Sequence, residues 1–119
     1  MTIDLPTILA EHARWLANPA TGKRADLSNA DLSGADLRGA NLKLANLISA
    51  KLIGANLAGA NLADADLRGA YLNGADLTGA NLRWANLGWA DLRDADLTGI
   101  DSRGANVNMA TVTGVTGAI

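Results

Sequence analysis

A unit of five residues repeats along most of this chain. Fifteen consecutive pentapeptides run from Ala25 to Gly99; each begins with Ala, has Leu at its third position and mostly carries Asp or Asn between them. A spacing of two places Ala and Leu on one face of an extended segment. The next Ala comes three residues after the Leu, which breaks a continuous strand, and a helix would rotate the Leu position by about 140° per repeat. Each pentapeptide therefore predicts a short extended side followed by a corner.

The last residues of the pentapeptides indicate how many sides make one coil. Taken every twenty residues, they separate into columns in which glycine is frequent or rare. Two columns are rich in glycine: Gly34, Gly54, Gly74, Asp94 and Gly114, and Gly39, Gly59, Gly79, Gly99 and Ile119. Each of the other two columns contains a single glycine, Gly69 in one and Gly104 in the other. This separation predicts four sides per coil, with positive φ at the two glycine-rich corners.

Composition limits the classes of protein to which the chain can belong. Its 119 residues are 49% hydrophobic and 18% charged, which is typical of one folded domain. There is no Cys, which removes disulfides and thiolate chemistry, and no apolar run approaches the roughly 18 residues of a membrane span. The first residues include Asp4 and Glu11 without a basic segment before them, so we expect a cytoplasmic protein and no membrane partner. A net charge of -2 without a basic stripe predicts no direct nucleic-acid binding.

Residues 5–17 have the pattern of a short amphipathic helix. Pro6 suits an early helical position, and Asn18 with Pro19 would end the helix. The apolar stripe consists of Leu5, Ile8, Leu9, His12, Trp15 and Leu16. We expect this helix to cover the first coil, with packing roles for His12 and Trp15, since an uncovered coil exposes apolar surface and unpaired backbone.

The tandem A(D/N)LXX pattern from Ala25 to about residue 115 resembles the pentapeptide-repeat family. The resemblance implies a right-handed quadrilateral β-helix in which the Ala and Leu positions fill the interior and the other three positions face solvent. The expected fold is thus an all-β solenoid of this form with a short N-terminal capping α-helix. Residues 1–24 would form the capping helix and linker, and residues 25–119 the β-helix.

An enzymatic site has little support in these residues. The one His lies in the predicted cap, and an interior filled by Leu leaves no cavity for a substrate. The outward Asp and Asn columns offer one side chain per side, whereas calcium requires several oxygen ligands. We therefore expect no catalytic, cofactor-binding or metal-binding residues, and interpret these columns as solvent-exposed faces and Asn ladders.

Large apolar residues at outward corners and on an apolar last coil predict a contact surface for a protein partner of unidentified type. The candidates are Trp84, Trp89 and Met109 at the corners and Val112 and Val115 on the last coil, and Leu44, Ile48 and Ile53 add a second outward group. No capping helix is predicted for the last coil, so a homodimer through this coil is a second expectation. Alternatively, each indole lies flat against the neighbouring coil, over Gly104 for Trp84 and over Gly69 for Trp89.

The sequence thus favours a non-enzymatic scaffold or protein-interaction module. The family resemblance also implies an alternative, because some members protect DNA gyrase by presenting an acidic rod similar to duplex DNA and pair at their C-terminal ends. Candidate residues for such DNA mimicry are Asp36, Asp76 and Asp96 on the third side. The fourth side has an outward column that is interpreted as a mixed solvent-exposed surface: Lys43, Ala63, Arg83 and Arg103. These basic residues, the modest net charge and the absence of Phe favour the first interpretation over DNA mimicry.

Overall fold

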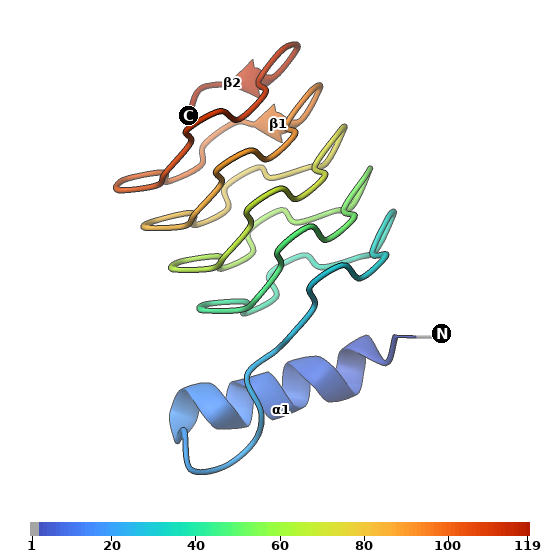
Figure 1. Ribbon diagram of the computed structural model, residues 1–119, viewed down its shortest axis with the longest axis vertical. Coiled ribbons are helices and arrows are strands. Elements are labelled where there is room, and N and C mark those ends of the chain that lie inside the picture. The colour runs from blue at the N-terminus through green and yellow to red at the C-terminus, as the bar shows by residue number, and fades with distance from the viewer. Residues whose placement is uncertain (1–2) are drawn as a thin grey trace.

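A stack of coils on one α-helix makes up the molecule (Figure 1). The computed structural model describes residues 3–119, so the first two residues of the predicted capping segment lie outside the described residues. Helix α1 spans Leu5–Ala17, as the sequence predicts, and lies across the N-terminal end of the stack. No helix within residues 3–119 combines the length and the apolar character needed to cross a bilayer.

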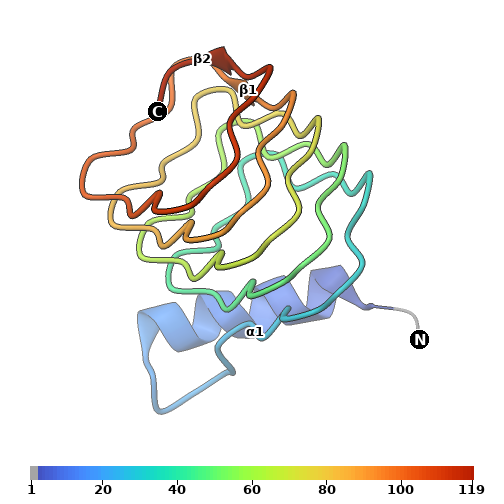
Figure 2. The same cartoon turned by 45° about the horizontal axis from the view of Figure 1, so that its top comes forward.

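Neighbouring coils pair in parallel at residues twenty apart, which confirms the predicted length of one coil. Single bridges join Asp26 to Asn46 and continue in the same register to the pair Asp91 and Thr111. Only the last pairing extends to two residues on each side, where β1 (Asp96–Leu97) lies parallel to β2 (Thr116–Gly117). The strands are this short because a turn interrupts the extended backbone in every pentapeptide, as Figure 2 shows from another angle.

Leucine and alanine fill the interior of the coils, as predicted. Every Leu at the third position from Leu27 to Leu97 is at most 3% exposed, and every first-position Ala from Ala45 to Ala95 is at most 1% exposed. The pattern changes on the fourth side of the fourth coil, residues 85–104, where Ile100 takes the Ala position and Ser102 the Leu position. Ile100 still packs against the core, so the large side chain has moved by two residues while the side remains filled.

Every corner residue from Asn29 to Gly114 has positive φ, which corrects the prediction that only the two glycine-rich corners do. In each turn up to Ala95 the N–H of an Ala donates to the carbonyl of the Leu three residues earlier, as between Ala60 and Leu57 at 3.0 Å, and the later turns keep the same bond with other residues at these positions. A positive φ at the second central residue is the mark of a type II turn. The same turn therefore closes all four sides, and the glycine content of a corner does not distinguish its backbone geometry.

The ends of helix α1 are set by local capping. The Asp4 side chain accepts a hydrogen bond from the Thr7 N–H at 3.2 Å, and Pro6 occupies the first turn. Asn18 ends the helix and donates its N–H to the Arg14 carbonyl. The chain then returns along the helix so closely that a Cβ on Gly22 would lie 2.6 Å from the Trp15 nitrogen, and only glycine fits there.

His12 joins the helix to the coils through two hydrogen bonds from a fully buried ring. Its Nδ1 accepts the N–H of Ala25 at 2.9 Å, which leaves Nε2–H to donate to the Lys43 carbonyl at 2.8 Å. The ring is therefore neutral, with its proton on Nε2. Burial is the main factor that lowers the pKa of His12; the Lys43 hydrogen bond opposes it and the nearby charge of Arg24 adds to it.

We predict that core and outward positions of one pentapeptide differ sharply in their effect on stability. Leu52→Ala should lower the free energy of unfolding by about 2–5 kcal/mol, because Leu52 is fully buried. Ile53→Ala removes a side chain of the same size that is 47% exposed, and should change it by less than about 1 kcal/mol. Equal losses in a denaturant titration would contradict the inward direction of the Leu column.

We further predict that mild acid destabilises the cap through His12. An unfolded His has a pKa of 6.5 and the folded ring a lower one, so below pH 6.5 the unfolded chain binds a proton that the folded chain rejects. The free energy of unfolding should then fall by up to about 1.4 kcal/mol per pH unit. Melting curves at about pH 7.5 and about pH 5.5 test this, with His12→Gln as the control that cannot titrate.

Asp36 and Asp101 do not interfere in that window, because their pKa values of about 2 keep them ionised throughout. If wild type and His12→Gln lose the same stability between the two pH values, the buried neutral ring is not the acid-sensitive group.

Candidate interaction surface

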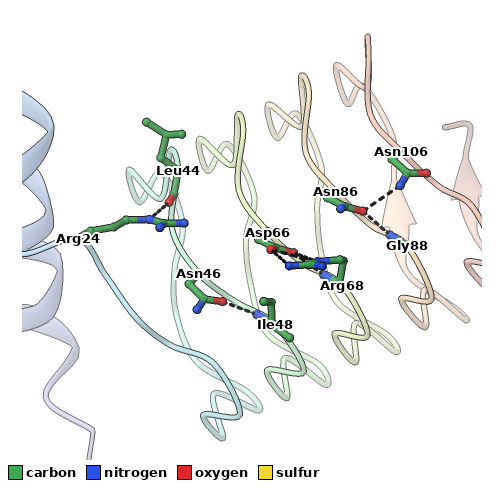
Figure 3. A network of polar contacts seen from close by, with 9 residues as sticks. All are labelled: Arg24, Leu44, Asn46, Ile48, Asp66, Arg68, Asn86, Gly88 and Asn106. Carbon is green, nitrogen blue, oxygen red and sulfur yellow. Dashed lines mark hydrogen bonds and ion pairs between the residues drawn. The ribbon is translucent and has the colours of Figure 1, made fainter.

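One side of the stack is bordered on both edges by large exposed apolar residues. We call it the tryptophan face: the outward surface of residues 45–49, 65–69, 85–89 and 105–109, with the corner residues Leu44, Asp64, Trp84 and Gly104 that precede them. Figure 3 looks along this side. Trp84 and Trp89 end consecutive pentapeptides, so they lie at the two ends of the side formed by residues 85–89. Met109 lies one coil beyond Trp89.

Both tryptophans are highly exposed on an unfavourable backbone. Trp84 is 66% exposed with φ of 61°, and Trp89 is 70% exposed with φ of 62°. Met109 is similar, with 65% exposure and φ of 61°. Large side chains rarely adopt this left-handed conformation, whereas Gly, Asn and Asp tolerate it. Within residues 3–119, Leu44 is the only other large apolar residue at a positive-φ corner, and it also borders the tryptophan face.

The two indoles differ in how they meet the neighbouring coil. A Cβ on Gly104 would lie 2.6 Å from Cδ2 of Trp84, so the Trp84 ring lies directly over that glycine. The corresponding interpretation for Trp89 is wrong, because the closest side-chain atom at Gly69 is the Ser49 hydroxyl, 3.4 Å from the Cβ position. Corner side chains thus lean toward the following coil, and at Trp89 this direction leads toward Met109.

The floor of the tryptophan face is fixed by side chains that cap their own turns. Asn46 and Asn86 each accept the N–H of the residue two positions later through Oδ1, at 3.1 and 3.0 Å (Figure 3). Asp66 does the same and also binds the Arg68 guanidinium, with a shortest distance of 2.6 Å. The predicted Asn ladder is reduced to one bond, from Asn106 Nδ2 to Asn86 Oδ1 at 3.1 Å. Within this face the Asn and Asp side chains are therefore held in place.

The two valines of the candidate set lie on the last described coil, in different environments. Val112 is 41% exposed, whereas Val115 is half-buried and packs against the core. Val107, at the inward third position of the same coil, is 36% exposed. Val112 also takes the inward third position, so its exposure belongs to the C-terminal end of the described stack and not to the tryptophan face, while Val115 belongs mainly to the interior.

The three acidic candidates of the third side are not equivalent. Asp36 forms a bidentate pair with Arg38, which holds the pKa of the carboxyl at about 2 and offsets its charge. Asp96 accepts hydrogen bonds from the Thr98 hydroxyl and N–H, and these lower its pKa. Asp76 is held in the same way by Thr78. The carboxylates are thus used locally in turns, and one of the three is paired with a cation.

Sequence reasoning missed the pairing within Asp-Leu-Arg repeats. Arg38, Arg68 and Arg93 each bind the Asp two residues earlier, and Arg103 binds Asp101 across the intervening Ser102. The signal was present in the pentapeptide itself, because residues two and four of each unit both face outward across one turn.

The clefts of the described residues include one at the cap and one on the fourth side. One cleft of about 230 Å³ lies between α1 and the first coil, lined by residues that include Ile8, Lys23 and Arg24. A second, of about 240 Å³, lies on the fourth side next to Trp84. Among residues 3–119, no three His, Cys, Asp or Glu side chains gather in a way that could hold a metal ion.

Comparisons with solved structures place the chain among repeat proteins. A pentapeptide repeat protein (Rfr23) from the cyanobacterium Cyanothece 51142 is 42% identical with a TM-score of 0.72, over 72% of this chain and 58% of that one. HetL from the cyanobacterium Nostoc, a pentapeptide repeat protein involved in heterocyst differentiation regulation, is 42% identical with a TM-score of 0.73, over 77% of this chain and 44% of that one. A thylakoid-lumen pentapeptide repeat protein of Arabidopsis thaliana is 39% identical with a TM-score of 0.62, over 72% and 63%.

The chain covers between 44% and 63% of the length of these three relatives, and their shared fold implies a right-handed β-helix here. None of the curated proteins matches the chain. The family model described as pentapeptide repeats (8 copies) matches residues 25–62, 60–99 and 80–116. The chain is therefore a member of the pentapeptide-repeat family.

Proposed function

We propose that this chain is a non-enzymatic interaction module that binds a protein partner through the tryptophan face. The β-helix acts as a rigid support, and its twenty-residue register favours a quadrilateral cross-section with four separate faces. Trp84, Trp89 and Met109 are the anchors in this proposal. A second copy of the chain, joined through the end of the last coil, is the alternative partner, and Val112 is then the exposed contact.

The observation that carries the proposal is the combination of backbone strain and exposure at the tryptophans. A left-handed conformation costs a non-glycine residue about 1–2 kcal/mol. Side chains that are 66% and 70% exposed recover little of this by burial within the chain. Glycine occupies ten of the equivalent corners from Asn29 to Gly114 without that cost. Strain of this kind, at residues that add little to the core, is typical of a functional surface.

A protein partner suits the shape and chemistry of this face better than a small molecule. Ligand pockets are concave and enclose most of the ligand, whereas the tryptophan face follows the flat side of a coil stack. Trp and Met are enriched in the cores of protein interfaces, where Trp is a frequent energetic anchor.

We predict that glycine at position 89 gives a more stable fold than alanine. Trp89→Gly removes the strain of a left-handed residue, whereas Trp89→Ala keeps it. The glycine variant should exceed the alanine variant by about 1 kcal/mol in free energy of unfolding and should be no less stable than wild type. Denaturant titrations of the three proteins measure this. If alanine were equal to glycine, the strain argument for the tryptophan face would lose its basis.

We predict that a photo-crosslinking amino acid at position 89 captures a specific protein in the source cells. The same probe at Tyr71, which is 45% exposed on the second side, serves as the control for surface position. We expect a discrete adduct from position 89. This adduct should disappear with Trp84→Gly and should not form from position 71. An adduct of twice the chain mass would identify a second copy as the partner. The proposal fails if position 89 gives no adduct or gives the same adducts as position 71.

A further inference from the structure

Two cations on the fourth side lack the partner that the other repeat arginines have. Arg38, Arg68 and Arg93 follow an Asp by two residues and are neutralised by it. Lys43 and Arg83 instead follow Asn41 and Asn81, whose Oδ1 atoms accept only the backbone N–H of the cation. Within residues 3–119, the Lys43 side chain has no ion pair, and Arg83 reaches Asp101 only at 3.8 Å, an Asp already bound by Arg103.

Both cations line the same cleft of about 240 Å³, and Ala63 lies between them. The three residues occupy one outward column, one coil apart, so the small Ala63 side chain leaves a gap between two long basic ones. Ala63 is only 9% exposed and forms the floor. Asn61, Asn81, Asp64 and Trp84 complete the lining. The base of the cleft is held by the cap, because the Lys43 carbonyl accepts the His12 Nε2–H.

The cleft presents hydrogen-bond donors almost exclusively. The Asn61 and Asn81 Oδ1 atoms are occupied by the N–H groups of Ala63 and Arg83, both at 3.0 Å. Their Nδ2 groups have no hydrogen-bond partner among residues 3–119 and are left as donors. Lys and Arg side chains only donate, so Asp64 provides the one negatively charged acceptor in the lining. A group that only accepts hydrogen bonds and carries negative charge complements this arrangement.

We propose that this cleft binds a carboxylate, supplied by an Asp or Glu side chain of the protein partner. The planar guanidinium of Arg83 matches a carboxylate in a bidentate geometry, and Lys43 adds charge from the other wall. Phosphate fits less well, because its second negative charge would be repelled by Asp64. The volume lies below the roughly 300 Å³ at which pockets for drug-sized ligands begin, and suits a single side chain. Trp84 belongs to both this cleft and the tryptophan face, so one partner can engage both.

The test uses ¹⁵N-labelled protein at low salt and three probes: acetyl-tetraglutamate amide, acetyl-tetraglutamine amide and inorganic phosphate. Shifts of the Trp84 indole N–H and of the Asn61 and Asn81 side-chain amides report on the cleft. We expect these signals to move with the glutamate peptide, to stay with the glutamine peptide, and to respond more weakly to phosphate. Tighter binding of phosphate than of the glutamate peptide would overturn the carboxylate assignment, and unmoved signals would overturn the site.

Matched variants separate the site from general electrostatics. Arg83→Gln should weaken binding of the glutamate peptide about tenfold, the usual effect of losing a hydrogen bond to a charged group. Arg93→Gln removes the same charge from a pair with Asp91 on the second side and should change the affinity less than about twofold. Asp64→Asn should tighten binding, because it removes the repelling carboxylate. Equal losses with Arg83→Gln and Arg93→Gln would overturn the proposal.

This inference rests on the proposed function only for the source of the carboxylate. The peptide titration needs no cellular partner, so it fails or succeeds independently of crosslinking at position 89. Peptide binding without an adduct would remove the proposed function and leave the cleft, whereas an adduct without peptide binding would remove the cleft alone.

Discussion

The hydrogen-bonded turn from each Leu to the Ala three residues later is the constraint on which the rest of the molecule depends. It returns the chain to the same phase in every pentapeptide, so that Ala and Leu always face inward. The second position is mostly Asp or Asn, because its side chain caps the same turn by accepting the N–H two residues later. Differences between faces therefore lie at the fourth and fifth positions, in the choice of Asp or Asn at the second, and at exceptions such as Lys51 and Tyr71.

The sequence pattern was sufficient for the parts of the fold that depend on periodicity. The helix bounds, the twenty-residue coil and the buried Ala and Leu columns follow from spacing alone, and each agrees with the structure. Corner geometry could not be read in this way, because glycine frequency reflects both backbone need and surface use. Trp84 and Trp89 occupy the same turn conformation as Gly74, so the glycine columns indicated where side chains are absent and not where φ is positive.

The ion pairs between the second and fourth residues of one pentapeptide could not be predicted from the columns of the sequence taken one at a time. Counting Asp and Arg along each face suggests mixed charge everywhere, yet most arginines are neutralised inside their own pentapeptide. Asn differs from Asp by one nitrogen in place of one oxygen. When Asn and not Asp lies two residues before a cation, the cation has no ion pair within its own pentapeptide. Lys43 and Arg83 follow Asn, so neither is neutralised within its own pentapeptide, and Arg83 only shares Asp101 with Arg103 at 3.8 Å.

The capping helix connects stability to the free cations in a way that neither element shows alone. Helix α1 covers the apolar end of the stack, and both ring nitrogens of its buried His12 form hydrogen bonds with the coils. One of these bonds holds the carbonyl of Lys43 at the base of the cleft on the fourth side. The hydrogen bonds of buried His12 therefore fix the backbone of the first coil on the fourth side. The regular Leu stack beyond that coil supports strained corners such as Trp84 and Trp89. A fold with this division of roles can vary its surface at three positions in five without disturbing the core.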